Sequence, residues 1–308
     1  MSGRNHYQAA VACSKLTGAS YARCVQLERQ GLISPRCPVP DASTADQRSF
    51  EALMVHVMAN ALSERQLGAA FGFASAFPGM NHITLVLHTE MAGRVLWELL
   101  PRLDTEHASV RGVPGMRMEW RTDRIVLHDL LSQACAHLVR SAYPRAMMHN
   151  LLPLERPLWT AGNTELSEAE AAARASWALA ETSREIWHKT GRDWLLSRML
   201  RRPALANMTC NRHGWASTYA DDREELAIEW CCEEGPAALA RRLRNAGVIA
   251  RPDDPLLGPL RPSRLLPPGG PIQEVRLGHA KVTLRRGDCS RVSPIQGLRI
   301  SARGEWYL

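Results

Sequence analysis

Three side chains in the second half of the sequence have the types and the spacing of zinc ligands. Cys210 and His213 are separated by two residues, and Cys231 follows on an expected neighbouring strand. Thiolate and imidazole groups are the usual ligands of tetrahedral zinc, so these three could share one metal ion. Cys231 and the adjacent Cys232 would point to opposite faces of a strand, so at most one of them could bind. We favour the simpler interpretation that the cysteines are buried, reduced thiols and that the protein has no cofactor.

The sequence contains none of the common catalytic motifs. It lacks G-x-x-x-x-G-K-[ST], G-x-G-x-x-G, H-E-x-x-H and G-x-S-x-G patterns. Tyr219-Ala220-Asp221-Asp222 resembles the YxDD box of reverse transcriptases, whose paired aspartates hold two metal ions. Charged residues, Arg223-Glu224-Glu225, follow where that family has an apolar strand, so we interpret the segment as a hairpin turn. An enzyme of unrecognised type is an alternative, but we expect a protein without catalytic activity.

Basic residues are concentrated at the two ends of the chain. The sequence has 38 basic and 31 acidic residues, and 35 of the basic ones are arginine. Residues 1–37 have a net charge of +4 and residues 235–308 of +8, whereas residues 38–234 have −5. The codon bias of a GC-rich bacterial genome would explain why these residues are arginine and not lysine, but not why acids are missing from the same segments. Such segments are typical of nucleic-acid-binding proteins, because phosphate contacts release counterions.

The first basic segment has the pattern of two short helices joined by a tight turn. Helices are expected over Tyr7–Leu16 and Tyr21–Gln30, with Ser20 as an N-cap and Gly31 at the end of the second helix. The segment resembles the helix-turn-helix of bacterial DNA-binding proteins, and Glu28-Arg29-Gln30-Gly31-Leu32-Ile33 resembles the MerR-type pattern. The resemblance covers about 25 residues and implies that the second helix enters a DNA groove. An ordinary αα-hairpin is the alternative.

Eight side chains of the two basic segments are candidate nucleic-acid contacts. Those on the second expected helix would face a groove, and those in the C-terminal segment would contact phosphates. The groups are Arg23, Gln26 and Arg29 on the second expected helix, and Arg241, Arg242, Arg244, Arg285 and Arg286 in the C-terminal segment. We therefore predict a nucleic-acid-binding protein, for DNA or RNA, that acts alone or as a subunit of a larger ribonucleoprotein or other nucleoprotein assembly. The alternative is a structural subunit that binds protein partners or itself and no nucleic acid.

The remaining sequence predicts a mixture of helices and strands. After a helix over Thr44–Phe77, the order β-α-β-β-α is expected, which is most of a ferredoxin-like or split βαβ unit. Its elements are Ile83–Leu87, Gly93–Leu103, Met116–Trp120, Ile125–Leu127 and a helix over Asp129–Ala142. Further on we expect a helix that begins with a capping box of Ser167 and Glu170, then a hairpin of Met208–Tyr219 and Glu225–Cys232. A helix over Pro236–Ala246, closed by Gly247, and a Pro-rich arm over Arg251–Pro271 should follow. The last expected elements are strands over Glu274–Leu284 and Leu298–Ser301, and an end that Trp306 and Tyr307 attach to the body.

The expected fold class is α+β, with four units along the chain. These are a helical hairpin (1–40), a ferredoxin-like body (41–150), a helix-rich second α+β unit (151–250) and a basic arm with a small β element (251–308). Hydrophobic residues make up 45% and charged residues 22%, as in folded globular proteins. No window approaches 18 uninterrupted apolar residues, and residues 1–6 lack the apolar stretch of a secretory signal, so we expect a cytoplasmic protein without a membrane partner.

Overall fold

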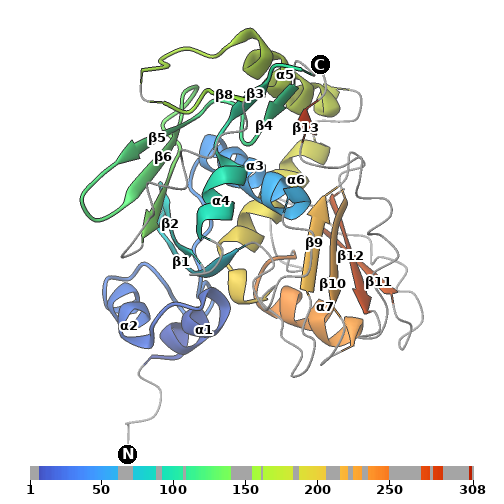
Figure 1. Ribbon diagram of the computed structural model, residues 1–308. Coiled ribbons are helices and arrows are strands. Elements are labelled where there is room, and N and C mark those ends of the chain that lie inside the picture. Colours follow the sequence, from blue (N-terminus) through green and yellow to red (C-terminus); the bar gives the residue numbers. More distant parts are fainter. Residues whose placement is uncertain are drawn as a thin grey trace, which may run out of the picture.

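In a computed structural model the chain forms three β-sheets with α-helices between and around them (Figure 1). The structure describes residues 7–61, 72–87, 92–106, 109–139, 155–160, 162–182, 187–205, 216–220, 225–230, 235–249, 272–277, 280–286 and 305–306. Helices and strands follow one another irregularly, and two of the sheets mix parallel and antiparallel pairs. The fold class is therefore α+β, as predicted.

The N-terminal segment is a pair of helices that pack against each other. These are α1 (Gln8–Thr17) and α2 (Tyr21–Arg29). Gly18 joins them in the left-handed backbone region, with φ of 72°, and Ser20 occupies the N-cap position of α2 without a side-chain hydrogen bond to the helix. Gly31, with φ of 70°, follows α2, and two backbone hydrogen bonds reach back into the last turn of the helix. This is a Schellman motif, so the predicted helix end is confirmed.

The largest sheet has the strand order β1-β2-β7-β6-β5. Only β2 and β7 are parallel, and the other neighbours are antiparallel. Buried and partly exposed residues alternate along β2, so one face of the sheet packs on the core. The strands are β1 (Phe73–Pro78), β2 (Ile83–Leu87), β5 (Met116–Trp120), β6 (Ile125–Asp129) and β7 (Cys135–Val139).

Strand β7 replaces the helix predicted over Asp129–Ala142. Asp129 ends β6, and a turn then leads into β7, where burial alternates residue by residue. That alternation is the period of a strand and not of a helix. The side-chain amide of Gln47 exchanges two hydrogen bonds of 3.0 Å with the backbone of Cys135 and so fixes the start of the strand. A contact between distant residues thus outweighs the local helical pattern.

The ferredoxin-like order is found only in part. The helix predicted over Thr44–Phe77 is shorter, because α3 (Ala45–Ala61) is followed later in that range by β1. The order β2, α4 (Ala92–Leu99), β5 and β6 agrees with the predicted β-α-β-β, but the last element is a strand. Two further strands between α4 and β5, β3 (Arg102–Asp104) and β4 (Ser109–Arg111), belong to another sheet.

That other sheet attaches the end of the chain to the body. Its strand order is β13-β4-β3-β8, with β8 at Glu155–Pro157 and β13 at Glu305–Trp306. Trp306 lies opposite Val110 of β4 in an antiparallel pair. The predicted attachment is confirmed for the backbone of residues 305–306, whereas Tyr307 lies outside the described residues.

Helix α5 (Glu168–Thr182) begins with the predicted capping box. The backbone N–H of Ser167 donates to Oε2 of Glu170 at 3.1 Å, and the backbone N–H of Glu170 donates to Oγ of Ser167 at 3.2 Å. The Glu170 side chain is also buried against Arg117, whose Nη1 lies 2.8 Å from Oε1 of the carboxylate. The same carboxylate therefore caps α5 and joins it to β5.

A third sheet, with the order β11-β12-β10-β9, lies in the second half of the chain. Strands β9 (Ala216–Ala220) and β10 (Glu225–Trp230) form the predicted antiparallel hairpin. The strand predicted over Glu274–Leu284 is instead a pair of antiparallel strands, β11 (Ile272–Leu277) and β12 (Ala280–Arg286). β12 is also parallel to β10, so this strand lies inside the sheet and not at its edge.

Helix α7 (Pro236–Asn245) packs against β11 and β12 through a buried face that includes Leu239 and Leu243. Gly247, with φ of 69°, closes it as predicted. The predicted arm over Arg251–Pro271 and the strand over Leu298–Ser301 lie outside the described residues.

One hydrophobic core includes residues from both halves of the chain. It contains Leu53 and Met58 of α3, Leu195 of α6 (Trp187–Leu200) and Ile228 of β10. The division into four units stays a prediction. Within the part of the chain that the structure describes, no helix is long and apolar enough to cross a membrane.

A buried ion pair between Glu51 of α3 and Arg201, just after α6, joins several parts of the fold. Both side chains are 0% exposed, and Nε and Nη2 of Arg201 lie 2.8 and 2.7 Å from the two carboxylate oxygens. Nη1 of Arg201 donates to the carbonyl oxygens of Pro40 and Gly79, and the carboxylate also accepts the hydroxyl of Ser197. Both charged groups are thus surrounded by hydrogen-bond partners, as buried charges require.

Two neighbouring arginines extend this contact to the end of α7. Arg198 donates to both oxygens of Asp41, at 2.8 to 3.2 Å. Arg202 donates to the backbone carbonyls of Val39, Ala246 and Arg198. Burial lowers the pKa of Arg202 to about 10, so the guanidinium is still charged at neutral pH. Because Ala246 caps α7 and Arg198 lies in the last turn of α6, this charge sits at the negative ends of two helix dipoles.

The substitution Glu51→Gln should lower the free energy of unfolding by about 3–5 kcal/mol, because Arg201 would be left buried without a counterion. Urea denaturation measures the effect. Glu119→Gln is the matched control, since Glu119 pairs with Arg121 on the surface and its loss should cost at most about 1 kcal/mol. Equal effects of the two substitutions would contradict a special role of the buried pair.

His56 is a half-buried histidine on α3 that is neutral in the folded protein. Its ring packs edge-on against Trp177, with 5.0 Å between the ring centroids. Burial, together with the charge of Arg192, lowers the pKa of His56 from 6.5 to about 3. The unfolded chain therefore binds a proton here as the pH falls below 6.5, while the folded chain does not. The contribution to stability is complete above that pH and is lost at about 1.4 kcal/mol per pH unit below it.

We therefore expect the His56→Gln variant to lose stability less steeply than the parent chain between about pH 6 and pH 4, where the unfolded histidine titrates. Urea midpoints measured at several pH values for both chains test this. Parallel pH profiles would show that His56 does not govern the acid sensitivity.

Candidate nucleic-acid interface

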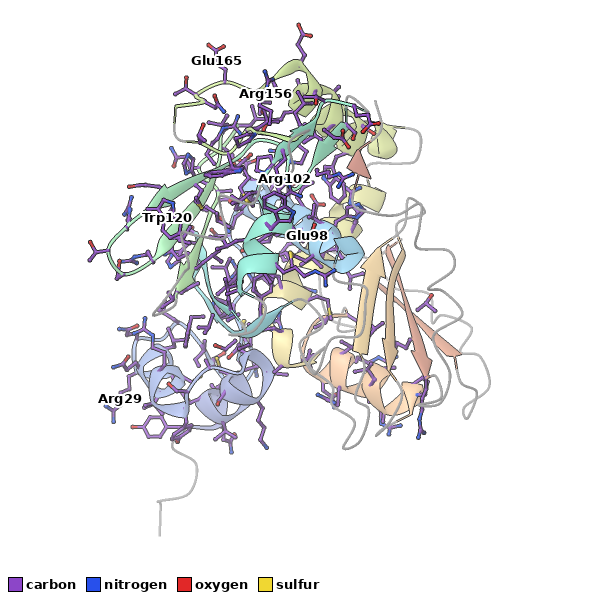
Figure 2. The ribbon with its side chains drawn as sticks, in the orientation of Figure 1. Arg29, Glu98, Arg102, Trp120, Arg156 and Glu165 are labelled. Carbon is purple, nitrogen blue, oxygen red and sulfur yellow. The ribbon has the colours of Figure 1, made fainter. Side chains whose placement is uncertain are left out.

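Helix α2 exposes the face that carries the three predicted groove residues. Arg23, Gln26 and Arg29 are exposed, whereas Cys24 and Leu27 are buried. The three exposed residues follow at intervals of three, so they lie along one side of the helix. Nη1 of Arg23 donates to Oε1 of Gln26 at 3.0 Å. Figure 2 shows Arg29 on the outer side of the helical pair.

Tyr7, at the start of α1, holds one of these arginines in place. Its hydroxyl oxygen accepts hydrogen bonds from Nη2 and Nε of Arg29, at 3.1 and 3.3 Å. The guanidinium carbon lies 5.5 Å from the centroid of the tyrosine ring. Sequence reasoning missed this residue, because two positions that are 22 residues apart meet only through the geometry of the turn.

Glu28, the single acid of residues 1–37, is bound within the helical pair. Its Oε2 accepts the backbone N–H of Ala10, in the first turn of α1, at 2.7 Å. The N–H groups at the start of a helix have no partners within the helix and carry partial positive charge. The partial positive charge at the start of α1 therefore balances this carboxylate. Among the described residues, no carboxylate pairs with Arg23 or Arg29.

The turn between the two helices holds α1 and α2 against β1. Gly18 lies so close to this strand that a Cβ atom would come within 2.6 Å of the carbonyl oxygen of Ala74. Thr17 donates its hydroxyl to the carbonyl of Cys13 at 2.8 Å, and its oxygen accepts the N–H of Ala19 at 3.1 Å. These contacts fix the orientation of α2 relative to β1, and so the direction in which the exposed face of α2 points.

The C-terminal candidates form a separate group around α7. Arg241 and Arg244 are exposed on this helix, while Arg242 is half-buried and has an interaction partner. Arg286 is exposed at the end of β12, and the side chain of Arg285 lies outside the described part. In Figure 1, α2 and α7 lie at the lower left and lower right of the view, so the two groups do not form one cluster.

The zinc hypothesis falls outside the described residues, because Cys210, His213 and Cys231 are not among them. Among the residues that are described, no group of three histidine, cysteine or acidic side chains could hold a metal ion. The rings of His82 and His137 do stack, with centroids 4.9 Å apart. Burial and then nearby positive charge lower the pKa of both, which favours neutral rings at pH 7.

Comparison with known proteins gives no assignment. No protein family matches the chain, and neither curated proteins nor solved structures give a significant match. Function is therefore inferred from the two basic surfaces described above.

The turn that positions α2 can be tested with Gly18→Ala. Left-handed backbone costs an L-residue about 1–2 kcal/mol, and here the new Cβ would also meet the backbone of β1. Gly31→Ala is the matched control, because Gly31 has nearly the same φ and nothing lies within 4 Å of the place that its new Cβ would take. We expect the urea midpoint to fall clearly further for Gly18→Ala, and similar losses would show that contact with β1 is unimportant.

Proposed function

We propose that the protein binds nucleic acid through the exposed face of α2, with the arginines of α7 and β12 as a second contact. The observation that carries the proposal is the charge of the α2 face. Arg23, Gln26 and Arg29 share this face, and the neighbouring acid Glu28 is held at the start of α1. A cationic surface of this kind attracts a polyanion.

The dimensions and side chains of α2 suit a groove of double-stranded DNA. The helix has nine residues, so it is about 13–14 Å long at about 1.5 Å per residue. Arginine can donate two hydrogen bonds to guanine and glutamine can pair with adenine, and both also reach phosphates. The hydrogen bond between Arg23 and Gln26 orders the two side chains before any contact with a base.

The arginines around α7 suit phosphate contacts. Arg241 and Arg244 lie in or near the last turn of the helix, and Arg286 lies at the end of β12. No acid lies on α7 itself, so attraction to phosphate is not opposed within this helix. Contacts of this kind add affinity without sequence preference and depend strongly on salt.

A protein partner is the second candidate for the N-terminal helical pair. Val11, Tyr21 and Leu32 are 43%, 48% and 45% exposed. Exposed apolar side chains on a small helical unit are typical of a protein interface. This alternative predicts a multimer or a complex by light scattering and no dependence on nucleic acid.

The proposal predicts salt-dependent binding that is weakened by substitutions on α2. Fluorescence anisotropy with labelled DNA and RNA, in duplex and single-stranded form, should show affinity falling steadily between about 50 and 200 mM salt. The double variant Arg23→Ala/Arg29→Ala should weaken binding at least about tenfold at the lower salt concentration. Arg121→Ala is the control, because this exposed arginine is paired with Glu119. The affinity of this variant for nucleic acid should differ from that of the parent chain by less than about twofold.

The arginines of α7 are tested by substitution and not by shortening the chain. A chain that ends near residue 251 would lose β12, an inner strand of its sheet, and would unfold that region. Arg241→Ala/Arg244→Ala should instead reduce the slope of log affinity against log salt by about one to two. Absence of binding to every probe at about 50 mM salt, or binding without a salt slope, would refute the proposed function.

A further inference from the structure

Two cysteines face each other inside the N-terminal helical pair. Cys13 of α1 and Cys24 of α2 are both 0% exposed. Each thiol influences the pKa of the other, so the two groups are close neighbours. They belong to one apolar cluster that also contains the small side chains of Ala9, Ala10 and Ala19. Because alanine side chains are small, the two helices can approach closely at this level.

The turn explains why the two thiols meet. Cys13 lies five residues before Gly18, and Cys24 lies five residues after Ala19. Positions at equal distance from a tight turn face each other when the helices fold back. Ser14 and Thr17 hold the turn through hydrogen bonds to the backbone of Ala19, at 2.6 and 3.1 Å. The two sulfur atoms therefore stay neighbours for as long as the helical pair is folded.

We propose that Cys13 and Cys24 are a redox pair whose oxidation joins α1 to α2 through a disulfide bond. The oxidant is a low-molecular-weight disulfide, such as oxidised glutathione. One protein thiol loses its proton and attacks a sulfur atom of the oxidant, which expels one small thiol. The second protein thiol then loses its proton, attacks the mixed disulfide and expels the other small thiol. The protein loses two electrons and two protons, and the oxidant becomes two thiols.

Burial controls the rate of this reaction. It raises the pKa of Cys13 to about 12 and also raises the pKa of Cys24, so little thiolate is present at neutral pH. Attack further requires a brief opening of the helical pair, because neither sulfur is exposed. Oxidation is therefore slow at neutral pH and faster in alkaline solution. Formation of the disulfide does not depend on the proposed function, so each can fail independently of the other.

Peptide mapping of the full chain tests the pair. The protein is incubated with oxidised glutathione at about pH 8.5, where more thiolate forms, then alkylated and digested with trypsin. Cleavage after Arg4, Lys15, Arg23 and Arg29 places the two cysteines in separate peptides, residues 5–15 and 24–29. We expect a linked species that is lighter than the sum of the two peptides by two hydrogen atoms and that separates on reduction.

Two variants show whether the link is specific. Cys24→Ala should abolish the linked species, and Cys37→Ala, which removes an exposed cysteine, should leave its yield unchanged. If Cys24→Ala does not fold, peptide mapping of the unsubstituted chain still shows whether Cys13 and Cys24 are linked. Glutathione on Cys37 without any link between peptides 5–15 and 24–29 would overturn the proposal, and so would a link that joins Cys37 to either peptide in its place.

Discussion

The bidentate pair of Glu51 and Arg201 is the contact on which the arrangement of the chain depends. Taking two charges out of water costs several kcal/mol for each ion, and the cost is offset only where the partners are well placed. Here the partners come from α3, from the end of α6, from the loop at Pro40 and from the turn at Gly79. These four segments have to be correctly positioned together. The pair thus disfavours alternative packings of the same hydrophobic surfaces, because each would leave a charge buried without its partners.

The interior contacts also change how the charge distribution is understood. The negative balance of residues 38–234 suggested an acidic body between basic ends. Several of its acids are in fact neutralised by arginines of the same region, as Glu51 is by Arg201 and Asp41 is by Arg198. Arginine therefore has two uses in this chain. It joins segments where it binds a carboxylate or a helix end, and it is exposed at Arg23 and Arg29 on α2 and at Arg241 and Arg244 on α7.

The features that could be predicted from the sequence are those that depend on neighbouring residues. The end of α2 at Gly31 and the capping box of Ser167 and Glu170 follow from local backbone and side-chain rules, and both are confirmed. Strand β7 was missed because Gln47, 88 residues away, binds its first residue. In the candidate site, helical spacing correctly placed Arg23, Gln26 and Arg29 on one face. The roles of Tyr7 and Glu28 could not be predicted, because each depends on how α1 and α2 are turned toward each other.

The position of β12 has a consequence for how the newly made chain folds. This strand lies between β10 and β11 and is parallel to β10, yet it follows β10 after about 50 residues. A ribosome that adds about 5–20 residues per second needs roughly 3–10 seconds to synthesise that interval. During this time the hairpin of β9 and β10 has an unpaired edge, which is a site for pairing with another chain. The hairpin of β9 and β10 therefore stays at risk of pairing with another chain until β12 inserts beside β10.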